Sequence, residues 1–111
     1  MKTRLIIAIA GLVLVLAGFV YLNMQIDYSV EKYCLEVTQL YPDLSQNEAL
    51  MKAVASEDIS LTRRNELVWT IGRMRIKEAL PLLNSFYDQQ ECDHEKRPCQ
   101  DELKKAIKRC E

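Results

Sequence analysis

The residues of this chain best suited to specific chemistry are four cysteines and a single histidine. Cys92, His94 and Cys99 lie in the stretch CDHEKRPC, and with Cys110 or an acidic neighbour they could bind a zinc ion. The spacing matches none of the strong zinc-binding patterns. In an oxidising compartment the same two cysteines form a disulfide more readily. A loop closed by Cys92 and Cys99, with an exposed histidine, is therefore the favoured interpretation, and zinc binding is the alternative.

An even number of cysteines in a small exported domain predicts disulfides, because such a domain has only a modest hydrophobic core. Four cysteines allow three pairings, and Cys92 with Cys99 is the easiest local pair. That pair leaves Cys34 with Cys110, which would connect the first exported helix to the last. Closing so long a loop stabilises a fold by a few kcal/mol in the chain-entropy model. The alternative is that Cys34 and Cys110 are small buried apolar residues.

Several acidic side chains fall in expected turns, where we expect them to flank helices and to be solvated. They are Glu57, Asp58, Glu91, Asp93 and Glu95. A catalytic acid and base need a concave apolar pocket around them, which the sequence does not indicate. The sequence also has no nucleophile elbow, phosphate loop or dinucleotide fingerprint. We therefore expect no enzyme, no cofactor and no small-molecule substrate, and the net charge of −1 gives no reason to expect nucleic acid.

The first residues of the chain have the composition of a membrane span. Lys2 and Arg4 are followed by a segment, residues 5–22, that has no charged or strongly polar side chain. As a helix this segment reaches about 27 Å, close to the thickness of the hydrocarbon core of a bilayer. Positive charges stay on the cytoplasmic side of a membrane, so the N-terminus is expected there. The expected order is a cytoplasmic N-terminus, a transmembrane signal-anchor helix, a juxtamembrane linker and an extracytoplasmic domain: residues 1–4, 5–22, 23–29 and 30–111.

A cleaved signal peptide is the alternative interpretation of the same segment. The stretch VLA that ends at Ala17 is a candidate cleavage site, but the residues after it, GFVYL, remain apolar. No cysteine lies near this site, which argues against a lipoprotein anchor. In an uncleaved anchor, Phe19 and Tyr21 lie near the interface, where aromatic rings are favoured. We expect an uncleaved, single-pass anchor in a bacterial inner membrane with the domain in the periplasm; the alternative is a soluble domain released after Ala17.

Beyond the anchor, apolar residues recur at the three- and four-residue spacing of amphipathic helices. Pro42 ends the first of these helices, and Ser45 with Glu48 forms a capping box at the start of the second. Pro81 falls in the first turn of the fourth helix, where its missing amide does no harm. No segment alternates with period two. The domain is therefore expected to be all-α, with helices over about residues 30–41, 45–56, 60–74, 77–87 and 99–110.

The stretch LVWTIGRMRIKEALPLL resembles the HEAT-like helical repeat, in the short form also seen in phycobilin lyase-type proteins. In that family one helix ends in Leu-Gly, a turn follows, and Ala-Leu-Pro opens the second helix. The positions that match the repeat are Arg64, Leu67, Trp69, Ile71, Gly72, Leu80 and Pro81. The resemblance covers about one repeat, residues 58–88, and part of another, residues 99–110. It implies a short α-α superhelix of helical hairpins, in which Arg64 bonds to neighbouring turns.

The same stretch has a physical explanation of its own. Gly72 either lets the chain turn sharply at a helix end or lets two backbones come close. Trp69 is wide enough to span a gap between hairpins. About two and a half hairpins fall short of the three repeats normally needed for a stable array. Disulfides or a partner are therefore expected to compensate.

Charge is unevenly distributed along the exported part, since residues 62–79 are basic and residues 23–58 are acidic. Arg73, Arg75 and Lys77 form a candidate surface for an acidic partner or for lipid headgroups. The alternative is that opposite charges on neighbouring hairpins are solvated and pair loosely. The expected function is a membrane-anchored, extracytoplasmic interaction module whose partner is another protein. A secreted, metal-binding domain and a non-catalytic subunit of a membrane enzyme complex are the alternatives.

Overall fold

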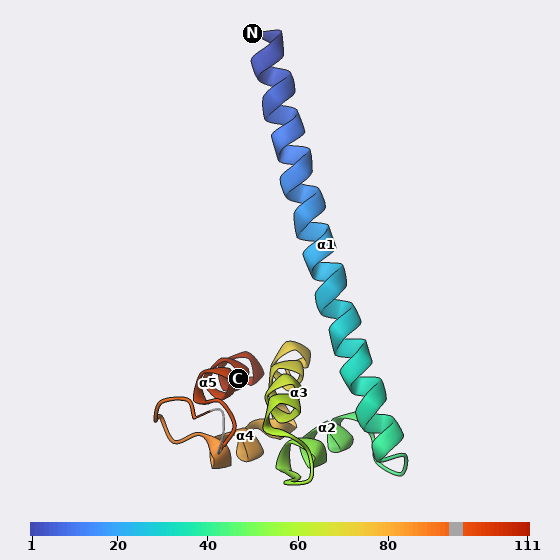
Figure 1. The fold of residues 1–111 in the computed structure, drawn as a ribbon, viewed down its shortest axis with the longest axis vertical. Coiled ribbons are helices and arrows are strands. Elements are labelled where there is room, and N and C mark those ends of the chain that lie inside the picture. Colours follow the sequence, from blue (N-terminus) through green and yellow to red (C-terminus); the bar gives the residue numbers. More distant parts are fainter. Residues whose placement is uncertain (94–96) are drawn as a thin grey trace. The chain divides into compact units, whose positions relative to one another are not determined.

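The computed structural model describes residues 1–93 and 97–111. Its elements are α1 (Lys2–Leu40), α2 (Gln46–Ala55), α3 (Leu61–Met74), the 3-10 turn η1 (Lys77–Ala79), α4 (Leu80–Phe86) and α5 (Gln100–Cys110). The described residues contain no strand, which confirms the all-α prediction (Figure 1). The chain divides into two units, Met1–Glu31 and Lys32–Glu111, and each is described below by itself.

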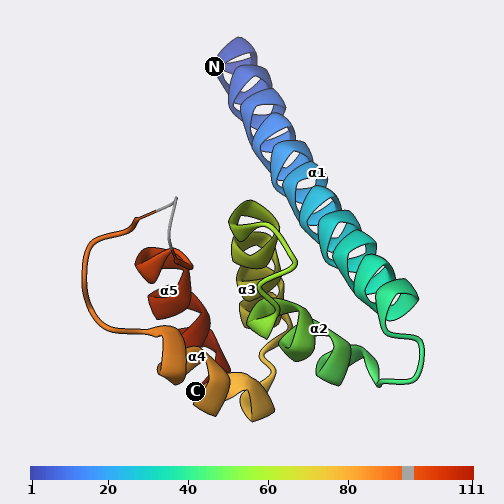
Figure 2. The same ribbon diagram turned by 60° about the horizontal axis from the view of Figure 1, so that its bottom comes forward.

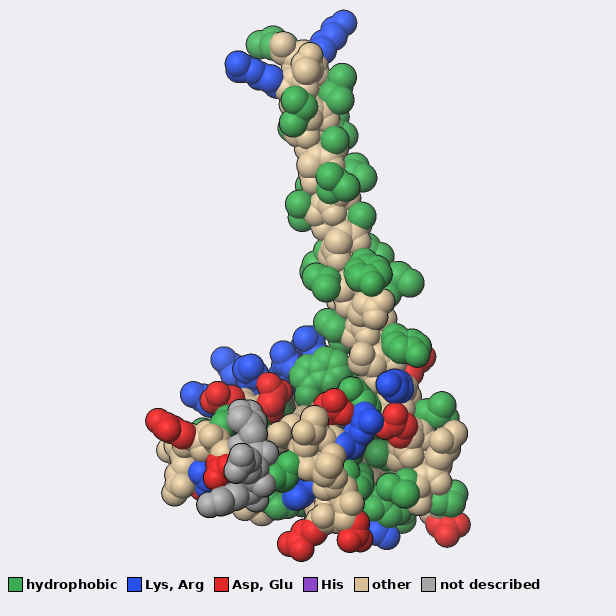
Figure 3. All heavy atoms as spheres, in the orientation of Figure 1, with side chains coloured by type: hydrophobic (Ala, Val, Ile, Leu, Met, Phe, Trp, Pro, Cys, Tyr) green, Lys and Arg blue, Asp and Glu red, His purple; other side chains and the backbone are tan. Residues whose placement is uncertain are grey.

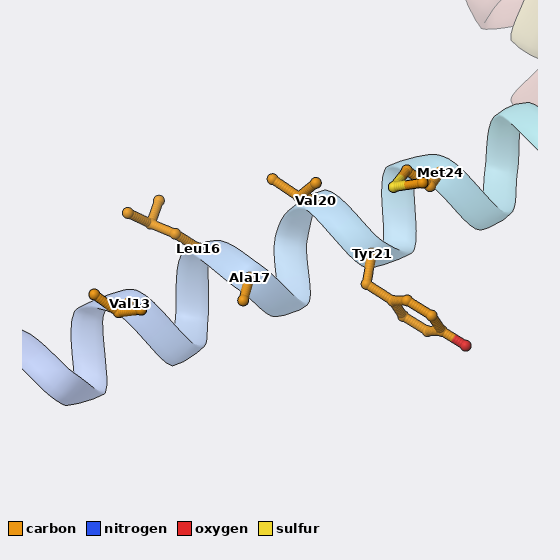
Figure 4. Close-up of a pocket in the computed structure, with 6 residues that line it drawn as sticks. All are labelled: Val13, Leu16, Ala17, Val20, Tyr21 and Met24. Carbon is orange, nitrogen blue, oxygen red and sulfur yellow. The ribbon is translucent and has the colours of Figure 1, made fainter.

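The first unit is a single helix with its apolar side chains exposed. α1 is long and apolar enough to cross a membrane. Its side chains include Leu14 at 73% exposed and Phe19 at 66%. Figure 4 shows six apolar residues between Val13 and Met24 that line a hollow, and all six project from α1 itself. The hollow is therefore a groove on the surface of one helix and not an enclosed site.

The helix also runs through residues 23–29, the segment that the sequence analysis assigned to a linker. The chain has no glycine or proline between Gly18 and Pro42, so no residue in this range interrupts helical geometry. Residues 23–29 are therefore helical and continuous with the apolar segment before them. After it, Cys34 and Val37 are the buried residues of α1, and both belong to the second unit.

The ends of the short helices follow from local sequence. The Ser45 side chain caps α2 by accepting a hydrogen bond from the Glu48 amide, and Ser60 caps α3 in the same way. At the other end of α3, Arg75 adopts a left-handed conformation with φ of 53°. Its amide donates to the carbonyl of Gly72 at 3.2 Å, and the next amide, of Ile76, donates to Ile71 at 3.3 Å. This is the double hydrogen bond of a Schellman motif, which usually has glycine at the left-handed position.

Gly72 lets two backbones come close, the second of the two roles expected for it. It lies inside α3 and not at the turn that ends the helix. A Cβ atom on Gly72 would lie 2.9 Å from the Cα of Ala106 in α5 and 3.1 Å from its Cβ. The two helices therefore approach so closely that only glycine fits. Near the start of both helices, the side-chain oxygen of Asn65 accepts a hydrogen bond from the Cys99 amide. The two contacts follow each other in the same order along α3 and α5, so the helices run in the same direction (Figure 2).

α2, α3, α4 and α5 enclose the core of the second unit around this contact. The largest fully buried side chains are Leu50, Val54, Leu67, Val68, Thr70, Ile71, Leu83, Leu103 and Cys110. Among the other repeat-matching positions, Leu80 is partly exposed, and Pro81 is exposed at the start of α4. All of the large buried side chains except Thr70 are apolar, and on α3 Leu67 and Ile71 lie about one helical turn apart.

We predict that Gly72→Ala destabilises the second unit by about 1–3 kcal/mol, because the new methyl group forces the α3 and α5 backbones apart. Denaturant unfolding of the detergent-solubilised chain, followed by Trp69 fluorescence, measures the change. Gly18→Ala is the matched control, since nothing lies within 4 Å of a Cβ atom at Gly18. Equal midpoints for both variants would contradict the close contact.

Candidate functional site

The loop between α4 and α5 is closed by a disulfide. Cys92 and Cys99 are bonded, with their Cα atoms 4.9 Å apart. Cys99 is the residue that precedes the first turn of α5, and the sulfur of Cys92 accepts a hydrogen bond from the Asp101 amide at 3.4 Å. Arg97 forms an ion pair with Asp88 and donates to the carbonyl of Glu91 at 3.1 Å. The disulfide and the arginine together fix the start of α5.

The same cysteines belong to the one group of candidate metal ligands found among the described residues. The ligand atoms of Cys92, Cys99 and Asp101 lie within 4.8 Å of one another. Sulfurs joined in a disulfide have no thiolate to offer a metal. His94, the other residue of the alternative zinc site, lies outside the described residues, as does Glu95. The described geometry is that of a loop closed by a disulfide.

Two polar residues with no recognisable sequence pattern, Asn65 and Gln100, hold this loop against the core. The Asn65 side-chain oxygen accepts a hydrogen bond from the Cys99 amide at 2.8 Å. Gln100 is only 2% exposed; it accepts from the Asp88 amide at 2.8 Å and donates to the Phe86 carbonyl at 3.0 Å. No local pattern identifies these residues, because their partners lie on other elements and polar residues in amphipathic helices usually face solvent.

Cys34 and Cys110 differ from the expected disulfide, since both are buried free thiols in the structure. The sulfur of Cys34 lies 3.4 Å from Met74 Sδ, and that of Cys110 lies 3.7 Å from the carbonyl oxygen of Ile71. Each sulfur thus fills its own place against α3, as the alternative interpretation held. Burial raises the pKa of the Cys34 and Cys110 thiols, which keeps both in the unreactive protonated form near neutral pH.

Arg64 is a structural group in this unit. Its side chain is among the few charged or polar ones that are buried, at 8% exposed. Nε donates to the carbonyl of Val54 near the end of α2 at 2.7 Å, and the guanidinium lies over the Phe86 ring at 5.7 Å. A buried guanidinium with such partners connects α2, α3 and α4. It is not available to a ligand.

Arg73, Arg75 and Lys77, the candidate partner surface, are all exposed. The Arg73 guanidinium lies 5.5 Å from the ring centre of Trp69, which is partly exposed. The structure thus places Trp69 beside a cation at the surface, in addition to any packing role. Arg109 lies close to Gly72, within 3.7 Å of its would-be Cβ, so basic residues of α5 adjoin the end of α3.

We define the basic surface as the exposed or partly exposed cations at the end of α3, in η1 and in the last turn of α5. Its members are Arg73, Arg75, Lys77, Lys108 and Arg109. Figure 3 shows Lys and Arg side chains gathered over α5 and the neighbouring end of α3. Within the described residues, none of the five forms an ion pair with a carboxylate.

Comparisons with protein-family models, with curated proteins and with solved structures find no match to this chain. The HEAT-like assignment therefore still depends on the residues that match the repeat. Any function must be argued from the apolar helix, the closed loop and the basic surface.

We predict that the native chain shows no rapidly reacting thiol at neutral pH, and that unfolding without reductant exposes two of its four cysteines. Thiol titration before and after unfolding tests this, and non-reducing peptide mapping identifies Cys92 with Cys99. Reduction before unfolding is the control, and it releases all four thiols. If no thiol appears on unfolding, Cys34 and Cys110 are paired in solution and the buried-thiol assignment is wrong.

We predict that Asn65→Ala lowers the free energy of unfolding by about 1 kcal/mol, because the Cys99 amide loses its acceptor. The comparison variant is Asn84→Ala, whose side chain makes only an exposed hydrogen bond to the Leu80 carbonyl within its own helix. Thermal unfolding of the two variants should separate them by several degrees. An equal loss of stability in both would show that the Asn65 bond has no special weight.

Proposed function

We propose that this chain is a membrane-anchored protein-interaction module whose helical domain lies outside the cytoplasm. α1 inserts residues 5–22 as a single-pass anchor in a bacterial inner membrane, with the N-terminus in the cytoplasm and the domain in the periplasm. The observation that carries the proposal is the first unit itself. It is an apolar helix, and no other element of that unit covers its side chains.

The exposed apolar side chains support the anchor. Leaving an apolar surface in water costs about 25 cal/mol for each square ångström, and a bilayer removes this cost along the whole segment. A helix also satisfies its own backbone hydrogen bonds, which lipid cannot do. Lys2 and Arg4 precede the segment and favour a cytoplasmic N-terminus. The disulfide between Cys92 and Cys99 supports an oxidising compartment for the domain.

The second unit supports an interaction role. Its surface carries cations that have no carboxylate partner within the described residues, beside a partly exposed tryptophan. Tryptophan and arginine are enriched in protein interfaces. We also propose that residues 58–88 form one HEAT-like repeat. The side-by-side packing of α3 and α5 is compatible with the first helices of two successive repeats.

A soluble, secreted domain remains the alternative, with cleavage near Ala17. The grouped ligand atoms of Cys92, Cys99 and Asp101 favour metal binding by that form only where the disulfide is reduced. Zinc content measured under reducing and under oxidising conditions distinguishes a metal site from the disulfide-closed loop. The third candidate, a non-catalytic subunit of a membrane enzyme complex, predicts that the native chain copurifies with that complex.

We predict that the native chain stays in alkaline-washed membranes and that its intact mass includes Met1. A soluble chain that begins at Gly18 would contradict the anchor. Leu14→Arg places a charge at the centre of the span, where insertion costs about 2.5–3.5 kcal/mol, and should release much of the chain. Tyr28→Arg is the control, because Tyr28 is also exposed, at 65% against 73% for Leu14, but lies beyond the apolar segment.

A further inference from the structure

We propose that the basic surface binds the anionic phosphate headgroups of the membrane that holds α1. This inference rests on the proposed anchoring and adds a lipid contact to the interaction module. It depends on the unpaired charge of the surface, on the position of Trp69 and on the length of the tether.

The charge of the basic surface is not neutralised by its own domain. Three other cations of the second unit have carboxylate partners: Arg63 lies 3.4 Å from Glu36 and 2.8 Å from Glu66, Arg97 pairs with Asp88, and Lys105 lies 3.6 Å from Glu102. In the part of the unit that the structure describes, cations without a carboxylate partner also occur elsewhere, at Lys32, Lys52, Arg64 and Lys104, but there they are not gathered at one place in the fold. The five cations of the basic surface have no such pair among the described residues. The acidic residues nearest to these five cations in sequence are Glu78 and Glu111.

Helix dipoles explain part of this arrangement. Arg73 lies in the last turn of α3, and Lys108 and Arg109 lie in the last turn of α5, where cations are generally favourable. The dipole does not explain Arg75 and Lys77, which lie beyond the end of α3. The parallel packing of α3 and α5 then brings the two basic last turns together. Arg75 and Lys77 extend the positive charge beyond what the dipole favours, and an anionic ligand would be attracted to the whole set.

Trp69 gives the surface the character of a membrane-interface site. Its ring is partly exposed and stacks near the Arg73 guanidinium, with 5.5 Å between the cation and the ring centre. Tryptophan favours the headgroup level of a bilayer, and basic side chains there are attracted to anionic lipids. The pair therefore offers both contacts that such an interface rewards.

The tether favours lipid over an acidic protein. Met74, next to Arg73, contacts Cys34, which lies twelve residues after Leu22. Even a fully extended chain of this length reaches only about 40 Å, so Cys34 stays within that distance of the end of the proposed span. A short tether holds two groups at a high effective concentration, and weak contacts then suffice. No described feature provides the same proximity to an acidic protein.

The test uses the full chain in lipid nanodiscs, made either of phosphatidylcholine or of a mixture with phosphatidylglycerol. Trp69 is the only tryptophan of the chain, so its fluorescence reports on the basic surface directly. In anionic discs we expect a blue shift and about a twofold loss of acrylamide quenching. Salt at about 1 M, where the screening length is about 3 Å, should abolish both effects.

Arg75→Gln combined with Arg109→Gln should remove the response to anionic lipid, while Arg73 is kept because its substitution would itself change the fluorescence. The matched control compares Arg75→Gln alone with Lys52→Gln, since each removes one positive charge from an exposed position of the second unit; Lys52→Gln should keep the response.

Identical Trp69 spectra in both kinds of disc would overturn the lipid contact and leave the anchor intact. A response to soluble polyglutamate but not to anionic discs would also overturn it, in favour of an acidic protein partner. Failure of the chain to enter any disc would overturn the anchor, and the inference with it.

Discussion

The contact of Gly72 with Ala106 is the constraint on which the second unit depends. With no side chain at Gly72, the backbones of α3 and α5 lie close enough for a whole set of specific interactions. At one end of the pair, Asn65 reaches the Cys99 amide and fixes the start of α5. At the other end, Arg109 adjoins Gly72, next to Arg73 in the chain. If a methyl group moved α3 and α5 apart, the hydrogen bond between Asn65 and the Cys99 amide would be strained. Arg109 would also move away from the end of α3.

The closed loop and the remote hydrogen bonds compensate for a small core. A domain of this size buries little apolar area, so fixing the start of α5 by a disulfide and by Asn65 and Gln100 limits the freedom of the chain where the core contributes least. Cys34 and Cys110 contribute to stability by packing and not by restricting the chain. Their thiols occupy space in the core itself, where packing density determines stability.

The sequence predicted what depends on local chemistry. Ser45 and Ser60 begin helices because their hydroxyls satisfy free amides, and the all-α architecture follows from apolar spacing. The length of the α1 helix was underestimated, since the change from apolar to polar composition after Leu22 suggested a linker although no residue there breaks a helix.

Other features depend on contacts that the local sequence does not show. Arg75 holds a left-handed position that favours glycine, and only the surrounding Schellman hydrogen bonds explain it. Asn65 and Gln100 could not be recognised, because their partners are brought near only by tertiary packing. The basic surface was half recognised for the same reason: its α3 and η1 residues adjoin in sequence, but those of α5 join them through the Gly72 contact.

The architecture also determines how strong any interaction of the basic surface must be. A free domain would need enough binding energy to overcome the loss of its translational freedom, which requires a large, complementary interface. In the anchored state that we propose, the domain has already lost most of that freedom. Several exposed cations and one aromatic ring, each worth little alone, can then act together, and salt or a competing acidic surface can reverse the contact. Long, flexible side chains on a tethered surface are suited to weak, reversible attachment, whereas a deep pocket is suited to a ligand captured from solution.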